Sequence, residues 1–342
     1  MKGINESTVS DWLTAHCPEF RGPLAFEAIT GGHSNLTYKV TDATGRRAVL
    51  RRPPLGAVIA TAHDMGREHR IISALAGTTV PVPPALALCR DESINEAPFY
   101  VMDYVDGAVL DTPAMVRQTL PDLATRAQLS ESVLDSLVAL HTIDPDQIGL
   151  GDLGRKEAFL DRQLKRWRTQ WEKTKTRELP AMEDTYDLLM RAKPEQKYTG
   201  IVHGDYRLGN MLATSDGRVA AVLDWELCTL GDTLADVGYL MNNWADDGEN
   251  GPSQAVAMPT STGGFMSRAQ FLAAYSARSG HSVDGVEYYR AFQWWRLAAI
   301  VEGVLSRYQK GVMGDPGMEL DVFRAQVDQM AEEALTMIRG IA

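Results

Sequence analysis

The chain has 342 residues, 44% of them hydrophobic and 23% charged, which is ordinary for a folded protein with two lobes or two domains. Its formal net charge of −11 argues against nucleic acid as a main partner, because phosphate binding needs a basic face. The polar start, the absence of an apolar run near the about 18–20 residues that span a bilayer, and three widely spaced cysteines predict a cytoplasmic protein without membrane contact.

After one polar helix at the start, residues up to 106 are predicted to be mainly β structure. The stretch FEAITGGHSNLTYKVTDATGRRAVLRRPP predicts three strands, with turns at Gly31-Gly32 and at DATGR and a stop at Pro53. A helix follows, in which four side chains have helical spacing: Met65, His69, Ile72 and Leu75. The segments VPVPPALALC and APFYVMDYVDG add two strands. We therefore expect a mostly antiparallel, five-stranded sheet with one inserted helix.

Beyond residue 106 the pattern becomes helical. The segment RAQLSESVLDSLVALHTI has one apolar face, and the segment AFLDRQLKRWRTQWEKTKTREL places four side chains on one seam: Leu160, Leu164, Trp167 and Trp171. Residues 201–226 interrupt these helices with a strand, a tight polar loop and a second strand, and helices resume from 233 to 342. The predicted fold is α+β, with a β lobe at 1–106 and a helical lobe at 107–342.

The segment IVHGDYRLGNMLATSDGRVAAVLDWE carries the most specific signal in the chain. Carboxylates between strands are costly to keep unless they hold a metal or take part in chemistry. The pattern H-x-D-x-x-x-x-N predicts that Asp205 orients and deprotonates a substrate hydroxyl, while Asn210 and then Asp224 hold Mg²⁺. His203 is expected to support the loop through hydrogen bonds rather than to bind metal.

The β lobe supplies the parts that phosphoryl transfer needs around a nucleotide. Backbone amides at Gly31 and Gly32 can approach phosphates, because glycine leaves the backbone accessible. Arg51 ends the third strand as a cation for the phosphates, and Glu68 on the next helix can hold it in place. Taken singly, these residues also fit a plain hairpin turn and ordinary surface charges.

Other chemistries explain fewer of these residues. A zinc hydrolase is disfavoured because the chain has no HExxH, and a serine hydrolase because it has no GxSxG. A Walker A kinase is excluded by the missing GxxxxGK[ST]. A glycosidase could use Asp205 and Asp224 as its two carboxylates, but Asn210 and the glycine turn would then have no role.

The motifs HGDYRLGN and VLDWE resemble those of the aminoglycoside phosphotransferase and choline kinase branch of the protein-kinase-like fold. This resemblance implies a bilobal α+β fold, with a small antiparallel β N-lobe and a mainly helical C-lobe, and it implies ATP (or GTP) with Mg²⁺ as cofactors. The segments GGHSNLTYKV and YVMDYVDG resemble the nucleotide loop and the adenine-binding linker of that family. The implied nucleotide site consists of Gly31, Gly32, His33, Ser34, Arg51, Glu68, Met102, Asp103 and Val105.

Further segments resemble the same family. LGDTLADVGYL resembles the stretch in which two acids, here Asp232 and Asp236, cap helices and brace the catalytic loop. VLRRPP, RQLKRWRTQW and WWRLAAIVEGVLSRYQKG resemble the kinase-like domain that is fused to, or encoded near, acyl-CoA dehydrogenases. That narrower resemblance implies a hydroxyacyl-CoA as the small-molecule hydroxyl acceptor and an acyl-CoA dehydrogenase as a partner.

One position departs from the family pattern, and it keeps alternatives open. The strand cation is Arg51 where the family has Lys, and these two cations are not freely interchangeable. One alternative is therefore an inactive nucleotide-binding partner of a dehydrogenase. The other is an aminoglycoside or amino-alcohol kinase, which could use the acids of WADDGENG: Asp246, Asp247 and Glu249.

Residues 155–177 form a basic island in this acidic chain, with nine Lys or Arg against three acids. The simpler interpretation is a solvated helix face whose aromatic residues pack into the core. The sharper hypothesis is an anion-binding face for the phosphates of CoA, with Arg162, Arg166 or Trp167 taking part.

Overall fold

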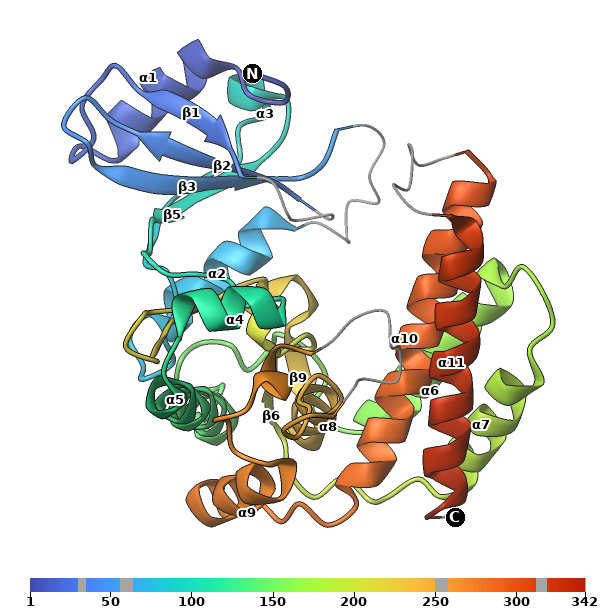
Figure 1. Ribbon diagram of the computed structural model, residues 1–342. Helices are drawn as coiled ribbons and strands as arrows, with labels where there is room; N and C mark the ends of the chain where they lie inside the picture. The colour runs from blue at the N-terminus through green and yellow to red at the C-terminus, as the bar shows by residue number, and fades with distance from the viewer. Residues whose placement is uncertain (30–34, 56–63, 250–257, 312–318, 342) are drawn as a thin grey trace.

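The protein has two lobes (Figure 1), and its computed structural model describes residues 1–29, 35–55, 64–249, 258–311 and 319–341. The α+β, two-lobed fold predicted from the sequence is confirmed. Within the described ranges, no helix combines the length and apolar character that crossing a membrane requires.

A five-stranded antiparallel sheet of order β1-β2-β3-β5-β4 forms the N-terminal lobe. Its elements are α1 (Glu6–His16), β1 (Ala25–Ala28), β2 (Leu36–Thr41), β3 (Arg47–Arg52), α2 (Met65–Leu75), β4 (Ala85–Cys89), α3 (Glu92–Asn95) and β5 (Phe99–Asp103). Because side chains alternate along a strand, Leu50 and Val101 pack with α1, whereas Val49 and Met102 pack with α2 on the other face. The predicted sheet and its inserted helix are confirmed.

The C-terminal lobe is mainly helical, with two small two-stranded sheets, β6–β9 and β7–β8. In Figure 1, α10 and α11 lie alongside each other with α6 and α7 packed against them. The elements of this lobe are α4 (Pro113–Thr119), α5 (Leu123–Thr142), α6 (Phe159–Thr174), α7 (Pro180–Arg191), β6 (Gly200–Val202), β7 (Met211–Ala213), β8 (Val219–Val222), β9 (Thr229–Gly231), α8 (Leu234–Asn242), α9 (Arg268–Ser279), α10 (Val286–Gln309) and α11 (Leu320–Arg339), with 3₁₀ turns at Leu208–Asn210, Trp225–Leu227 and Pro259–Thr262.

The seam predicted on α6 is confirmed, because all four of its apolar side chains are buried in the main core: Leu160, Leu164, Trp167 and Trp171. That core also contains Val49 and Met102 from the N-terminal sheet, so packing is continuous between the lobes. The division of the chain at residue 106 therefore stays a prediction.

The segment 201–226 has one strand more than predicted. β6 precedes the polar loop and pairs with β9, whereas β7 follows the loop and pairs with β8. The loop thus passes from one small sheet to the other. The extra strand is β7, and three residues carry too little alternation for a sequence pattern to reveal a strand.

Candidate active site

The polar loop after β6 brings together two of the predicted side chains, Asp205 and Asn210. The Asn210 Nδ2 donates a hydrogen bond of 2.7 Å to Oδ2 of Asp205 and another of 2.9 Å to the Asp205 carbonyl. Asn210 lies at the end of the short 3₁₀ turn that leads into β7. The amide therefore fixes the orientation of the carboxylate expected to act on a substrate hydroxyl.

Asp236 holds the beginning of this loop from the first turn of α8. Its two carboxylate oxygens accept hydrogen bonds from the backbone N–H groups of His203 (2.6 Å) and Gly204 (2.8 Å). The side chain is fully buried, so the two bonds are shielded from water. Asp232 caps the same helix by accepting a hydrogen bond from the Leu234 N–H at 3.1 Å. These contacts match the bracing role that the family resemblance implied.

His203 supports the loop from within, as the sequence interpretation expected. Its Nδ1 lies 3.2 Å from the Asp205 N–H, which donates to it, and its Nε2 lies 2.9 Å from the Leu223 carbonyl. The backbone donor at Nδ1 means that Nε2 carries the ring proton. Both ring nitrogens are thereby used, and His203 connects Asp205 to the strand that ends just before Asp224.

Two residues that the sequence did not single out also lie against Asp205. The Arg207 Nε is 3.4 Å from Asp205 Oδ1, and the buried Tyr239 phenol lies close enough to interact electrostatically with the same carboxylate. Burial, with the neighbouring Asp205 charge, raises the pKa of Tyr239, so its phenol stays a donor. Arg207 could have been suspected from its place in the motif, whereas α8 gives no local sign that Tyr239 faces the loop.

A second predicted group forms where the lobes meet. Arg51 of β3 lies between two carboxylates, with Nη2 at 2.6 Å from Asp224 Oδ1 and Nη1 at 3.4 Å from Glu68 Oε2. The Tyr100 hydroxyl donates to Glu68 at 3.0 Å. Burial raises the pKa of Glu68 and the Arg51 charge opposes that rise. The structure thus brings together the strand cation, its helix acid and the predicted metal acid.

Asp224 occupies an unusual backbone conformation at the end of β8. Its φ of 64° and ψ of 65° are left-handed, a region that residues other than glycine rarely adopt. Such conformations cost energy and cluster at functional sites. The residue just before Asp224, Leu223, donates its N–H to the Asn210 carbonyl at 2.8 Å. This bond keeps Asp224 close to Asn210.

The side chains of Asn210 and Asp224 are suited to Mg²⁺. Within the described ranges, no group of three or more His, Cys, Asp or Glu side chains is arranged to hold a metal ion. Mg²⁺, however, usually takes one or two protein oxygens and completes its shell with water and phosphate. Among the described contacts, Asn210 Oδ1 and Asp224 Oδ2 accept no hydrogen bond, so both oxygens remain to coordinate a cation that arrives with a nucleotide.

Of the remaining residues predicted to bind the nucleotide, some lie within the described part of the chain and others do not. Gly31, Gly32, His33 and Ser34 lie outside the described residues. The others belong to β5 and the linker that follows it: Met102, Asp103 and Val105.

Their surroundings limit how these linker residues could contact a base. Met102 is buried in the main core. The Asp103 N–H donates to the Pro84 carbonyl at 2.8 Å, so Asp103 would contact a base through its own carbonyl. Val105 is half-buried, and its backbone makes no hydrogen bond within the described part of the chain.

A cavity of about 400 Å³ lies beside the catalytic loop, between α2, α6 and α10. It touches the backbone at Gly204. One wall is acidic, with Glu68 and Glu226, whereas the wall made by α6 and α10 carries Arg166 and Arg296 with three aromatic rings: Phe159, Trp167 and Phe292. This cavity could not be predicted from the sequence, because its walls come from segments far apart in the chain.

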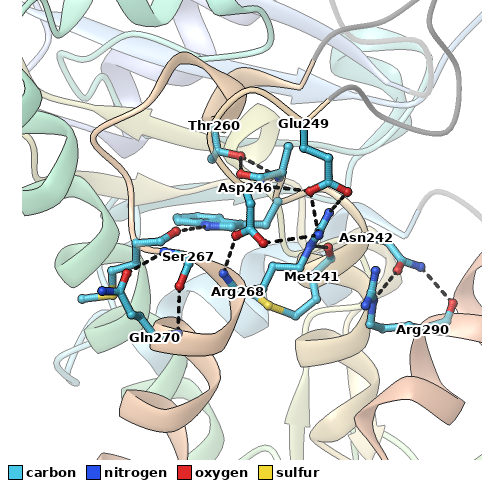
Figure 2. A network of polar contacts seen from close by, with 12 residues as sticks. Met241, Asn242, Asp246, Glu249, Thr260, Ser267, Arg268, Gln270 and Arg290 are labelled. Carbon is cyan, nitrogen blue, oxygen red and sulfur yellow. Dashed lines mark hydrogen bonds and ion pairs between the residues drawn. The ribbon is translucent and has the colours of Figure 1, made fainter.

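The acidic loop considered for aminoglycoside binding forms ion pairs with an arginine of the protein itself. Figure 2 shows Arg268 of α9 between Asp246 and Glu249. Its guanidinium lies 2.7 Å from Glu249 and 3.7 Å from Asp246, and its backbone N–H donates to Asp246 at 2.7 Å. The third acid, Asp247, is exposed. Two of the three acids are therefore already paired with one cation of the protein itself.

Comparison with protein families identifies the class of this two-lobed protein. A family model described as "Phosphotransferase enzyme family" matches residues 25–295. The chain belongs to this family, and it shares the fold of aminoglycoside phosphotransferases and choline kinases.

The curated relatives are longer proteins that carry acyl-CoA dehydrogenase names. The chain is 33% identical over 306 residues to acyl-CoA dehydrogenase family member 10 of Mus musculus, covering 85% of this chain and 27% of that protein. It is 27% identical over 340 residues to acyl-CoA dehydrogenase family member 11 of Homo sapiens, covering 97% of this chain and 42% of that protein. The chain thus spans less than half the length of either relative.

Solved structures give the same fold. A Ralstonia eutropha JMP134 protein assigned to the aminoglycoside phosphotransferases is 33% identical, with a TM-score of 0.81 and 99% of each chain covered. Choline kinase from Cryptosporidium parvum matches with a TM-score of 0.67 at 13% identity, covering 98% of this chain and 95% of the other. At that identity the second match speaks for the fold alone.

Proposed function

We propose that this protein transfers the γ-phosphoryl group of ATP to a hydroxyl of an acyl-CoA, with Mg²⁺ as cofactor. The observation that carries the proposal is the convergence of five predicted side chains from both lobes: Asp205, Asn210, Asp224, Arg51 and Glu68. Phosphoryl transfer depends mainly on positioning and charge stabilisation, and this arrangement supplies both.

Each side chain has a distinct role in the proposed reaction. Asp205, oriented by Asn210, accepts the proton of the attacking hydroxyl. Asn210 and Asp224 hold Mg²⁺, which neutralises phosphate charge when it is bound with the nucleotide. Arg51 supplies a planar cation for phosphate oxygens, and Glu68 fixes its direction.

The nucleotide is proposed to be ATP, with GTP as the alternative. One structural neighbour, an aminoglycoside phosphotransferase, was solved in a ternary complex with ADP and hygromycin B. We propose that Gly31, Gly32, His33 and Ser34 contact the phosphates of the nucleotide. The base would lie at the linker, against Met102 and the backbone of Asp103 and Val105.

For the acceptor, two observations favour a hydroxyacyl-CoA over a cationic aminoglycoside or amino-alcohol. The relatives carry acyl-CoA dehydrogenase names, and arginines line the cavity beside the catalytic loop. Two of the three acids that could hold an amino sugar, Asp246 and Glu249, are instead paired with Arg268. The proposal extends to an acyl-CoA dehydrogenase as a partner and to a cytoplasmic location.

Phosphorus NMR tests this function directly. Purified protein is incubated with ATP, Mg²⁺ and pooled 3- and 4-hydroxyacyl-CoAs, alongside an Asp205→Asn control. We expect a new phosphate-ester resonance that the control lacks, with transfer slowed about 10²–10⁴-fold by loss of the base and ATP binding retained. ATP binding without transfer to any acyl-CoA would contradict the proposal and favour a non-catalytic nucleotide-binding partner. Equal loss of ATP binding in the control would give Asp205 a structural role.

A further inference from the structure

The basic island at 155–177 divides in the structure into two kinds of cation. One kind has carboxylate partners: Lys156 with Asp146, Arg168 with Glu172 and Glu183, Lys175 with Glu172 and Glu178, and Arg177 with Glu302 and Asp328. The other kind has no carboxylate of the described residues within 4.0 Å. Its members include three arginines: Arg155 in the segment before α6, and Arg162 and Arg166 on α6.

These three arginines, called the arginine strip below, lie next to one another. The Arg162 Nη2 donates to the Arg155 carbonyl at 2.6 Å. Arg166 follows Arg162 by one turn of α6, so both project from the same side of the helix. Like charges at this spacing repel each other, which makes the strip unfavourable unless an anion lies against it.

Arg162, at the centre of the strip, has an unfavourable environment for its charge. The Arg162 Nη1 is buried and has no hydrogen-bond partner among the described residues. Burial and the nearby Arg155 charge lower the pKa of Arg162. Glu157 and Asp161 act on it only from beyond salt-bridge distance, and Asp161 pairs with Lys193. A buried donor without a partner is costly, and an anion that accepted its hydrogen bond would remove that cost.

The strip continues into the cavity beside the catalytic loop. Arg166 lines that cavity together with Trp167, and its guanidinium carbon lies 5.1 Å from the Trp167 ring centre. Across the cavity wall, Arg296 donates to the Gly204 carbonyl at 3.1 Å and to Gln293 at 2.8 Å. Arg296 is buried, with no described carboxylate within salt-bridge distance. Positive charge therefore extends from the outer face of α6 toward the catalytic loop.

We propose that the arginine strip binds the phosphates of the acceptor's CoA moiety, while the acyl end enters the cavity past Trp167. This inference rests on the proposed function. Guanidinium groups bind phosphates through paired hydrogen bonds, and three of them match a ligand with several phosphates. The cavity of about 400 Å³ is in the range of pockets for small ligands. Its aromatic wall of Phe159, Trp167 and Phe292 suits an apolar chain.

The inference is tested by comparing two probes that differ in phosphate. CoA and pantetheine, which lacks the phosphates, are titrated calorimetrically into the full chain. The variants are Arg166→Glu and Arg155→Glu, both at exposed positions, and the control is Lys173→Glu, an exposed cation on the same helix. We expect each arginine variant to reduce the preference for CoA over pantetheine by about ten-fold. The control should change it by less than about two-fold.

Three results would overturn the inference. The first is a preference for CoA over pantetheine that survives both arginine substitutions, and the second is wild-type protein that does not distinguish the two ligands. The third is an equal loss of this preference in Lys173→Glu, which would indicate a general charge effect. Thermal unfolding of each variant checks that the fold is retained. The milder Arg162→Gln, which keeps a donor but removes charge, should lie between wild type and Arg166→Glu.

The design separates this inference from the proposed function. If CoA binding depends on the strip but no hydroxyacyl-CoA is phosphorylated, the binding site stands and the proposed reaction fails. If hydroxyacyl-pantetheine is phosphorylated with the same KM as hydroxyacyl-CoA, the kinase stands and the phosphate site fails. Raised salt should weaken CoA binding more than pantetheine binding, because screening acts on the charged contacts.

Discussion

Arg51 and Arg268 are two of the arginines that lie between two carboxylates, yet the groups they form differ in burial, backbone geometry and place in the fold. Arg51 contacts Asp224 at 2.6 Å and Glu68 at 3.4 Å, and it joins residues up to 173 positions apart. Arg268 contacts Glu249 and Asp246 within a stretch of 22 positions. We call these the lobe group and the loop group.

Burial and backbone geometry separate the two groups. In the lobe group the side chains of Arg51, Glu68 and Asp224 are 12%, 2% and 30% exposed, and Asp224 has left-handed backbone angles. In the loop group the acids are 45% and 41% exposed, and Arg268 also donates to the Met241 carbonyl at 3.1 Å. An arginine between two acids does not by itself mark an active site. An acid with a left-handed backbone conformation where the lobes meet, such as Asp224, is a better indication of an active site.

The largest effect is expected from removing the acid of the lobe group. Asp224→Ala should lower phosphoryl transfer by about 10²–10³-fold, because the transferred charge loses its metal-borne stabilisation. Initial rates at increasing Mg²⁺ measure this change, and excess Mg²⁺ should not restore the rate. The matched control is Asp246→Ala in the loop group, which should keep near-normal activity. Equal losses in both variants would remove the functional distinction between the groups.

A smaller effect is expected from the cation of the lobe group. Arg51→Met should raise the KM for ATP about ten-fold or more, since one charge-assisted contact to phosphate is lost. Arg51→Lys keeps the charge but not the planar fork, so its KM should lie between those of wild type and Arg51→Met. If Arg51→Lys were instead much more active than wild type, the arginine would mark a weakened nucleotide site. ATP titrations of the three proteins make the comparison.

The lobe group and the loop that carries Asp205 and Asn210 were largely predictable from the sequence, and the reason is local. Asp205 and Asn210 share one short loop, and Asp224 directly follows an apolar strand, so spacing alone indicated their chemistry. Arg51 and Glu68 were paired because the predicted helix that carries Glu68 is the next regular element after the strand that Arg51 ends. The five-stranded sheet followed from alternation and turn residues.

What the sequence could not predict depends on contacts between distant segments. Tyr239 of α8 interacts electrostatically with Asp205, and Arg296 of α10 donates a hydrogen bond to the Gly204 carbonyl. No local sequence pattern predicts either contact. The pairing of β6 with β9 joins strands separated by a whole hairpin. The basic island looked uniform in sequence, whereas its division into paired and unpaired cations depends on α7, α10 and α11, which supply part of the carboxylates.

The smallest effect is expected in the loop group, and it concerns stability. Arg268→Met should lower the free energy of unfolding by about 1–2 kcal/mol, because two charge-assisted hydrogen bonds are lost at a partly exposed site. Activity should change by less than about two-fold. Although partial burial acts to raise it, the hydrogen bonds from Arg268 and from the Asp246 N–H hold the pKa of Glu249 below its ordinary value. A carboxylate with a lowered pKa stabilises the fold above its unfolded-state value and loses that contribution as the pH falls through the folded-state value.

The difference in unfolding free energy between wild type and Arg268→Met should therefore be full at neutral pH. It should shrink as the pH falls through the lowered, folded-state pKa of Glu249, because the wild-type carboxylate then takes up a proton and loses its charge-assisted bonds. Urea unfolding at a series of pH values measures this, with Arg268→Lys as the charge-retaining control. A difference that stays constant down to the lowest pH would mean that Arg268 stabilises the loop through packing and its contact with the Met241 carbonyl. The loop group would then be held by the backbone rather than by charge, which would sharpen its contrast with the lobe group.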